Sequence, residues 1–168
     1  MWINKKAIRR EAPGLFKTRG RFAAHRVFNK LEILQLEFGS GGGIGNAKGI
    51  ASLFNGLTDP KHQLFLGENT LDYLAQYPEP PKNGFEDLVL KQDAFTFHAG
   101  FMKPTDKHNF STSRNAFGGF GAGGSFVISD LENNLTYAYT MNKMGQEMMN
   151  MKREVQIRRA VYKTFANT

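Results

Sequence analysis

Apolar residues recur at helical spacing in one segment of the first half of the chain. The residues that carry this spacing are Ala47, Ile50, Ala51, Phe54 and Leu57. Intervals of three and four residues place them on one face of an α-helix. Asn46 suits an N-cap and Gly56 suits a C-cap. The pattern predicts a helix over residues 47–56 whose apolar face lies on a core.

Two further segments have helical character. Residues 70–77 predict a short helix in which Thr70 caps the start, Leu71 and Leu74 are buried, and Pro78 ends the element. The last 25 residues predict a longer helix with Arg158 at the edge of an apolar stripe. The stripe consists of Met144, Met148, Met151, Val155, Tyr162 and Phe165. Such a stripe either packs across a sheet or forms a groove for a partner.

The remaining pattern predicts strands and loops. Residues 31–38 predict a short strand, and a period of two begins at Phe95 and runs to Phe101. A polar loop over 103–115 follows. Residues 118–141 then predict a hairpin, with a turn at 130–134 and a second strand rich in Tyr and Thr.

Length and composition limit the class of protein. The chain has 168 residues, 40% of them hydrophobic and 22% charged, which is typical of one globular domain or part of a larger one. It contains no Cys, which excludes a disulfide scaffold, a cysteine zinc site and a thiol nucleophile. No apolar run reaches the roughly 20 residues of a membrane helix.

The charge is concentrated at the two ends of the chain. The net charge is +7, and residues 1–30 alone carry nine basic side chains and one acidic one. A basic end can bind nucleic acid or anionic lipid, can form a solvated surface, or can be a mitochondrial presequence. No nucleic-acid-binding motif accompanies the charge, so we expect no nucleic-acid partner. Since no secretory signal is present, we expect an intracellular location, cytoplasmic or mitochondrial.

Several familiar sites are incomplete. Residues 119–124 fit the pattern G-x-G-x-x-G, but a dinucleotide site needs a helix after it, and a strand-like segment follows here. The four histidines have no metal-ligand spacing. We therefore expect no metal and no cofactor.

Two glycine clusters and their flanks carry a resemblance to a known family. Gly41 to Ala51 is similar to the "G-x-G-x-A-R-x-L-A" helix start of the β-lactamase-related serine hydrolases, and Gly100-Phe101 resembles their "G-L-G-F" strand. Phe117 to Ser125, followed by Asp130 and by Ala138 to Met144, resembles their "F-G-H-x-G-A-G-G-S … D-P-E … A-Y-x-M-N-x-M". The resemblance covers about residues 29–145, within the C-terminal half of the family's domain.

The resemblance implies an α+β fold, with an antiparallel sheet flanked by helices and a terminal helix on one face. It assigns residues 1–28 to an irregular basic segment and residues 29–168 to the C-terminal part of a β-lactamase-like domain. The implied chemistry is acyl transfer through a serine, with hydrolysis of an ester, amide or lactam. A small acyl compound would be the substrate of the intact protein.

The chain departs from the family at its catalytic residues. It contains no Ser-x-x-Lys and no Tyr-x-Asn or Tyr-x-Ser, so no catalytic residue is expected within it. Gly119-Phe120-Gly121 stands where the family has Lys-Thr-Gly or His-x-Gly along the pocket. The resemblance makes Gly119, Phe120, Gly121 and Ala122 the substrate-pocket strand, with the Ala122 N–H as an oxyanion donor.

Two functional interpretations follow. The chain is the C-terminal portion of a serine hydrolase and inactive alone, or it is a non-catalytic binding or structural module of the same fold. If it is half of a domain, an uncovered sheet face and an open strand edge would promote self-association.

Overall fold

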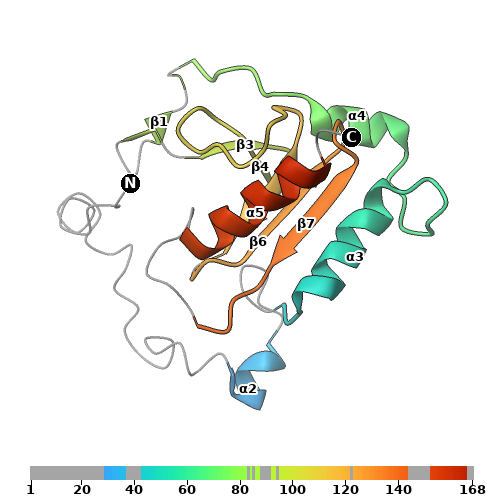
Figure 1. The fold of residues 1–168 in the computed structure, drawn as a ribbon, viewed down its shortest axis with the longest axis vertical. Coiled ribbons are helices and arrows are strands. Elements are labelled where there is room, and N and C mark those ends of the chain that lie inside the picture. Colours follow the sequence, from blue (N-terminus) through green and yellow to red (C-terminus); the bar gives the residue numbers. More distant parts are fainter. Residues whose placement is uncertain are drawn as a thin grey trace. The chain divides into compact units, whose positions relative to one another are not determined.

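The computed structural model describes residues 29–36, 43–82, 84, 86–87, 92–93, 95–121, 123–143 and 152–165 (Figure 1). The chain divides into two compact units, Met1–Gly45 with Asp87–Gln92, and Asn46–Glu86 with Asp93–Thr168. The predicted basic segment over residues 1–28 lies outside the described residues. Within the described residues no helix has the length and apolar character needed to cross a membrane.

Helix α2 (Leu31–Leu34) is the described element of the first unit, where the sequence pattern predicts a strand. That prediction is wrong. The amide N–H groups of Leu34 and Gln35 donate to the carbonyls four residues earlier, at 3.0 Å each. Leu, Glu and Gln dominate this segment and have high helix propensity, which outweighs the short apolar alternation.

Five antiparallel strands form the sheet of the second unit. They are β3 (Thr96–His98), β4 (Phe101–Lys103), β5 (Phe117–Phe120), β6 (Phe126–Asp130) and β7 (Leu135–Tyr139). Each strand pairs with its neighbour in the chain, in the order β3-β4-β5-β6-β7. Two short strands, β1 (Glu86–Asp87) and β2 (Gln92–Asp93), form a separate pair. The prediction of an α+β fold with an antiparallel sheet and helices is confirmed at this level.

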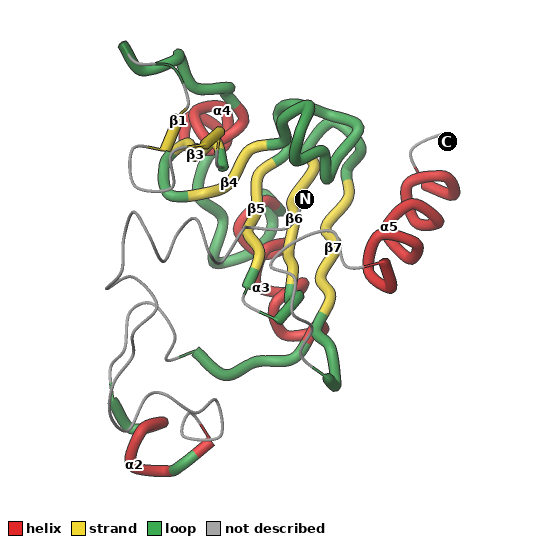
Figure 2. The backbone as a smooth tube through the Cα atoms, turned by 90° about the vertical axis from the view of Figure 1, so that its left-hand side faces the viewer, coloured by secondary structure: helices red, strands yellow, loops and turns green. Residues whose placement is uncertain are grey.

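Helices cover both faces of this sheet. Helix α3 (Ala47–Thr58) contacts β6 and β7, and helix α4 (Glu68–Ala75) lies against the end near β4. Helix α5 (Lys152–Phe165) contacts β7. Figure 2 shows α3 behind the strands and α5 beside β7. We call the two sides of the sheet the α3 face and the α5 face.

The register fixes which side chains share each face. Phe117 pairs with Ser129, and Ser129 with Thr136, so these three lie on the α3 face. The Ile128–Tyr137 pair lies on the α5 face. The main core cluster contains Phe110, Ala116, Phe126, Ile128, Tyr137 and Tyr162.

The predicted helix at 47–56 is confirmed and continues to Thr58. The Asn46 side chain accepts a hydrogen bond from the Gly49 N–H at 2.9 Å, as expected for an N-cap. Gly56 is not the C-cap but a buried residue within the helix. A Cβ atom there would lie 2.7 Å from Nδ1 of His62, so Gly56 allows the imidazole to pack on the helix.

Helix α4 begins two residues before the predicted start and ends two before the predicted end. Gly67, at φ 84°, precedes it in place of the predicted Thr70 cap. Leu71 and Leu74 are buried as predicted.

The predicted strand from Phe95 to Phe101 is two strands joined by a tight turn. Ala99 and Gly100 have φ angles of 48° and 86°, so the chain reverses between β3 and β4. Consecutive positive φ angles are typical of a type I′ hairpin turn. The alternation fails here because Ala at the first turn position gives no turn signal, and because Phe97 is 52% exposed.

The predicted hairpin at 118–141 corresponds to β6 and β7, joined by a turn at residues 131–134, and β5 adds a third strand before it. The predicted C-terminal helix is confirmed over Lys152–Phe165, while Met144, Met148 and Met151 lie outside the described residues. Its buried residues are Glu154, Arg158 and Tyr162. Arg158 is therefore at the centre of the buried face rather than at its edge, and Phe165 is 60% exposed.

Gly118 allows β5 and β6 to approach closely. A Cβ atom at Gly118 would lie 2.1 Å from the carbonyl oxygen of Val127 and 2.9 Å from Cα of Ile128. At Gly119 no described atom lies within 4 Å of a Cβ position. Two adjacent glycines on one strand therefore differ in their structural requirement.

We expect Gly118→Ala to lower the free energy of unfolding by at least about 2 kcal/mol, because β6 backbone must move to admit the methyl group. The matched control Gly119→Ala should leave stability unchanged or slightly raised, since alanine restricts the unfolded chain. Urea denaturation of both variants measures this. Equal losses for the two variants would contradict the close approach at Gly118.

Candidate functional site

The sequence-predicted pocket strand lies at the end of β5. Gly119 lies on the α3 face, opposite Val127. Strand β4 pairs with β5 only at Met102 and Gly118. Among the described strands, Gly119 and Phe120 therefore have no partner on the β4 side.

Phe120 has a packing role. Its ring stacks on Phe126 with centroids 4.2 Å apart and meets Phe110 edge-on at 5.4 Å. These rings belong to the core on the α5 face, so the Phe120 side chain lies on the opposite side of β5 from the open position at Gly119. Its aromatic contacts stabilise the sheet beyond their buried area.

Gly121 closes the turn between β5 and β6. Its N–H donates to the Ser125 carbonyl at 2.8 Å, and its carbonyl accepts from the Gly124 N–H at 3.0 Å. Gly123 and Gly124 have positive φ angles, 90° and 108°, which favour glycine. Ala122 lies outside the described residues, so its role as an oxyanion donor stays a prediction.

A buried carboxylate lies at the far end of β6, where sequence reasoning assigned no site. Asp130 is fully buried and accepts hydrogen bonds from Ser111 Oγ at 2.5 Å and from the Tyr162 hydroxyl at 2.7 Å. Asn133 donates to it from Nδ2 at 2.9 Å and from the backbone N–H at 3.1 Å. Burial raises the pKa of Tyr162 well above its usual value, so this hydroxyl remains a donor. The cluster is closed to solvent, which fits a structural role.

The loop before β5 is ordered around this carboxylate by alternating polar side chains. The backbone N–H of Ser111 donates to Asn109 Oδ1, that of Ser113 to Ser111 Oγ, and that of Asn115 to Ser113 Oγ, at 3.2, 2.9 and 3.0 Å. Such bonds to the residue two positions earlier are typical of turns. The alternate spacing of Asn109, Ser111, Ser113 and Asn115 is the sequence signal from which this loop structure could have been predicted.

Arg158 on α5 reaches the same region. Its Nε donates to Glu154 Oε1 at 2.7 Å, and its guanidinium lies 5.2 Å from the centre of the Phe126 ring. Nη1 lies 3.5 Å from the carbonyl oxygen of Asn109. Both charged side chains are buried, and removal of either partner would leave an uncompensated charge.

Lys103 is a buried amine that holds the end of α4. Nζ donates to the carbonyl oxygens of Leu74, Ala75 and Asn115 at 2.9, 3.1 and 3.0 Å. A cation at a helix C-terminus is stabilised by the helix dipole. Burial lowers the pKa of Lys103 to about 8.

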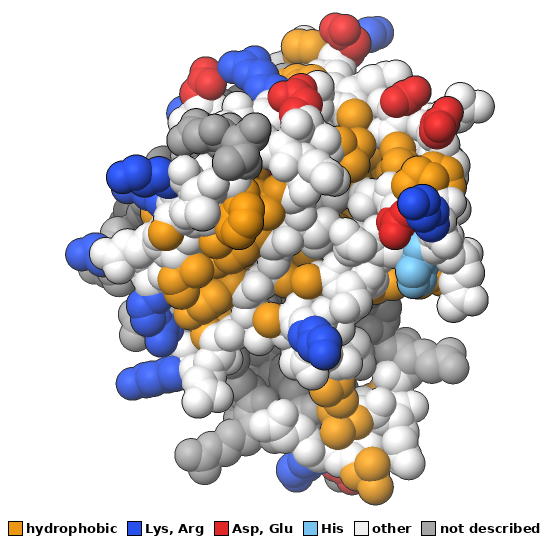
Figure 3. Space-filling view, turned by 45° about the vertical axis from the view of Figure 1, so that its right-hand side comes forward, with side chains coloured by type: hydrophobic (Ala, Val, Ile, Leu, Met, Phe, Trp, Pro, Cys, Tyr) orange, Lys and Arg blue, Asp and Glu red, His pale blue; other side chains and the backbone are white. Residues whose placement is uncertain are grey.

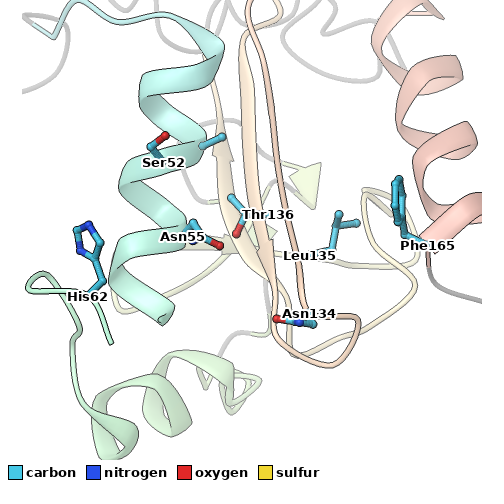
Figure 4. A pocket seen from close by; sticks show the side chains of 8 residues that line it. Ser52, Asn55, His62, Asn134, Leu135, Thr136 and Phe165 are labelled. Carbon is cyan, nitrogen blue, oxygen red and sulfur yellow. The ribbon is translucent and has the colours of Figure 1, made fainter. Parts of the chain in front are cut away.

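A cavity of about 660 Å³ lies beside the first residues of β7. Its lining comes from α3, the loop after α3, the start of β7 and the end of α5: Ala51, Ser52, Asn55, His62, Asn134, Leu135, Thr136 and Phe165 (Figure 4). Among the described residues no hydrogen bond joins Ser52 to His62, whose Nδ1 accepts instead from the Leu64 N–H at 3.1 Å. The cavity therefore contains no assembled nucleophile and base.

In the part of the chain that the structure describes, no three His, Cys, Asp or Glu side chains gather where they could hold an ion.

The comparisons with known proteins add no identification: no protein-family model and no curated protein matches the chain.

Loss of the hydroxyl group should change the stability of the protein differently at the two buried tyrosines. Tyr162 donates to Asp130, whereas the Tyr137 hydroxyl is buried with no described hydrogen-bond partner. We expect Tyr162→Phe to lower the free energy of unfolding by about 1–3 kcal/mol and Tyr137→Phe to leave it unchanged or raise it. Denaturant unfolding of both variants measures the difference, and a similar loss in both would argue against the Asp130 cluster.

Lys103 predicts a pH-dependent stability. Between about pH 8, its folded pKa, and 10.5, its ordinary value, the unfolded chain keeps a proton that the folded protein has lost. Stability rises with pH where the unfolded state binds more protons. The free energy of unfolding of the wild type, compared with that of Lys103→Met, should therefore rise by up to about 3 kcal/mol across this range. Denaturation of both proteins at pH 7, 8, 9 and 10 tests this. A constant difference would show that burial does not lower the Lys103 pKa.

Proposed function

We propose that this chain is the C-terminal portion of a β-lactamase-related serine hydrolase and is inactive alone. In the intact protein the activity would be acyl-transfer hydrolysis of an ester, amide or lactam. The observation that carries the proposal is the block from Phe117 to Met144, in which glycines, acidic residue and aromatic residues match the family in order and spacing.

The placement of this block supports the proposal. Its glycine-rich part forms β5 and the following turn, Asp130 ends β6, and Tyr139 ends β7. The three strands are consecutive and antiparallel, and a terminal helix packs on one face, as the resemblance implies. No residue of a described strand pairs with Gly119 on the β4 side, where the proposal places an acyl substrate.

The missing catalytic residues must come from polypeptide outside these 168 residues. A serine hydrolase needs a nucleophile and a base within hydrogen-bond reach of each other. Gly119 also lacks the polar side chain of the family's triplet. This chain would contribute main-chain features to the active site. These are the oxyanion donor at Ala122 and the glycines that let the substrate approach the strand.

The second candidate function is a non-catalytic binding or structural module of the same fold. It is favoured by the lost triplet side chain and by the structural roles of Phe120 in the core and Gly121 in the turn. The hydrolase requires that the source organism makes a longer protein that carries the catalytic residues, whereas the module does not.

Mapping the 5′ end of the native transcript and weighing the native protein separates them. A longer product that carries Ser-x-x-Lys and Tyr-x-Asn or Tyr-x-Ser upstream, and that reacts with a fluorophosphonate probe, supports the hydrolase. A native mass of 18.9 kDa with no reaction would reject the hydrolase in favour of the module.

In the intact hydrolase, Ala122→Pro should lower kcat at least about 100-fold, because proline removes the N–H that stabilises the oxyanion. Ala122→Gly keeps the N–H and is the matched control. A turn with a positive φ at its third position, here Gly123, accepts proline at its second. Initial rates with a chromogenic ester measure both variants, and equal rates would refute the oxyanion role.

A further inference from the structure

Helix α5 has a basic outer surface. Its only acidic side chain, Glu154, is buried and forms an ion pair with the buried Arg158 at 2.7 Å. The other cationic side chains of the helix are all exposed, and they are Lys152, Arg153, Arg159 and Lys163. Because the buried pair balances its own charge, the exposed part of α5 carries positive charge and no negative charge.

The described residues do not neutralise this surface with ion pairs. Among them, no acidic side chain forms an ion pair with Lys152, Arg153 or Arg159. The Arg153 Nη2 donates instead to the main-chain carbonyl of Lys143 at 3.1 Å, and Lys143 is itself exposed. Arg159 and Lys163 are four residues apart, a spacing at which like charges lower the stability of a helix. An anionic partner would relieve this repulsion.

An apolar flank runs along the same helix. Ile157, Val161 and Phe165 follow one another at intervals of four residues, which places them along one side of α5. Ile157 is 48% exposed and Phe165 is 60% exposed, while Val161 packs partly against the core. Figure 3 shows hydrophobic side chains in a diagonal band, with Lys and Arg side chains along its left border. The outer surface of α5 therefore combines cations with accessible apolar side chains.

This combination favours an anionic lipid surface over nucleic acid as the partner. Both are polyanions that basic side chains bind. Contacts with nucleic-acid phosphates use the cations but leave the aliphatic side chain of Ile157 without a role, and no nucleic-acid-binding motif accompanies it. At a lipid surface, basic side chains meet the headgroups while neighbouring apolar side chains enter the boundary with the acyl chains. A lipid surface therefore uses both parts of the exposed helix.

We propose that the outer surface of α5 binds a membrane surface that contains anionic phospholipid. The exposed cations lie at the phosphate and carboxylate groups of the lipids, and Ile157 enters the boundary below them. Tyr162 holds the opposite side of the helix on the sheet through its hydrogen bond to Asp130, so α5 binds as part of the folded domain. This inference does not depend on the hydrolase proposal, since it uses neither the glycine strand nor a nucleophile.

The probe is a sucrose-loaded vesicle made from an equimolar mixture of phosphatidylserine and phosphatidylcholine. The full 168-residue chain is incubated with these vesicles and sedimented, and the bound fraction is measured against lipid concentration. Vesicles of phosphatidylcholine alone are the control for lipid charge. We expect binding to the mixed vesicles to be at least about tenfold tighter than to the control and to weaken as salt is added, because salt screens exposed charges.

Variants of α5 separate its contribution from that of residues 1–30, which carry nine basic side chains. The double variant Lys152→Ala/Arg159→Ala should weaken binding to the mixed vesicles at least about tenfold. The matched control Lys48→Ala/Lys61→Ala removes the same charge from exposed positions on α3 and the loop after it, and should leave binding within about twofold. Circular dichroism checks that both double variants fold.

A second pair of variants tests the apolar contact. Ile157→Ser should weaken binding about threefold or more, because less apolar surface leaves water at the membrane. Leu53 on α3 has nearly the same exposure, 47%, so Leu53→Ser is the matched control and should leave binding unchanged. These two variants keep the net charge of the wild type.

Three results would overturn the proposal. The first is no binding of wild type to the mixed vesicles. The second is an equal loss in the two double variants, which would assign the binding to net charge or to residues 1–30. The third is an equal effect of Ile157→Ser and Leu53→Ser, which would leave a site that depends on charge alone, as expected for nucleic acid rather than lipid.

Discussion

The buried carboxylate of Asp130 is the interaction on which the arrangement of the sheet, loop and terminal helix depends. The carboxylate has no contact with solvent, so each of its oxygens must accept hydrogen bonds from donors within the protein. Those donors come from the loop at Ser111, from α5 at Tyr162 and from the turn at Asn133. Three segments far apart in sequence are thereby fixed to the end of one strand.

Polar contacts anchor α5 in addition to the core packing of Tyr162 and Val161. Its three buried residues are Glu154, Arg158 and Tyr162, each with a partner on the helix or across the core. Hydrogen bonds are directional, so they fix the rotation of the helix more strictly than apolar packing would.

The sequence pattern predicted the elements that depend on local signals. Helix α3 follows from its apolar spacing and the Asn46 cap, and Leu71 and Leu74 identify the buried face of α4. The turn between β3 and β4 was missed because positive φ at Ala99 is set by the hairpin and not by the residue type.

The buried charges were missed for a different reason. From the sequence alone, Lys103, Asp130 and Arg158 are expected at the surface, since charged side chains are rarely buried without partners. Glu154 and Asn133 are local partners, but the other partners lie 12 to 49 residues away, at Leu74, Ala75, Ser111, Asn115, Tyr162 and Asn109. Only the folded chain brings these pairs together. The candidate pocket strand, which the resemblance placed at residues 119–122, overlaps β5 only at Gly119 and Phe120, and the sequence could not show that Phe120 packs in the core on the α5 face.

The candidate pocket strand and the buried carboxylate are linked through β6, which pairs with β5 on one side and with β7 on the other. Gly118 sets the distance between β5 and β6, because a Cβ atom there would meet the Val127 carbonyl oxygen. At the end of β6, the Asp130 carboxylate accepts from the Asn133 N–H and fixes the turn into β7. A change that displaced Asp130 would therefore shift β6, and with it the strand that carries Gly119, without touching a substrate.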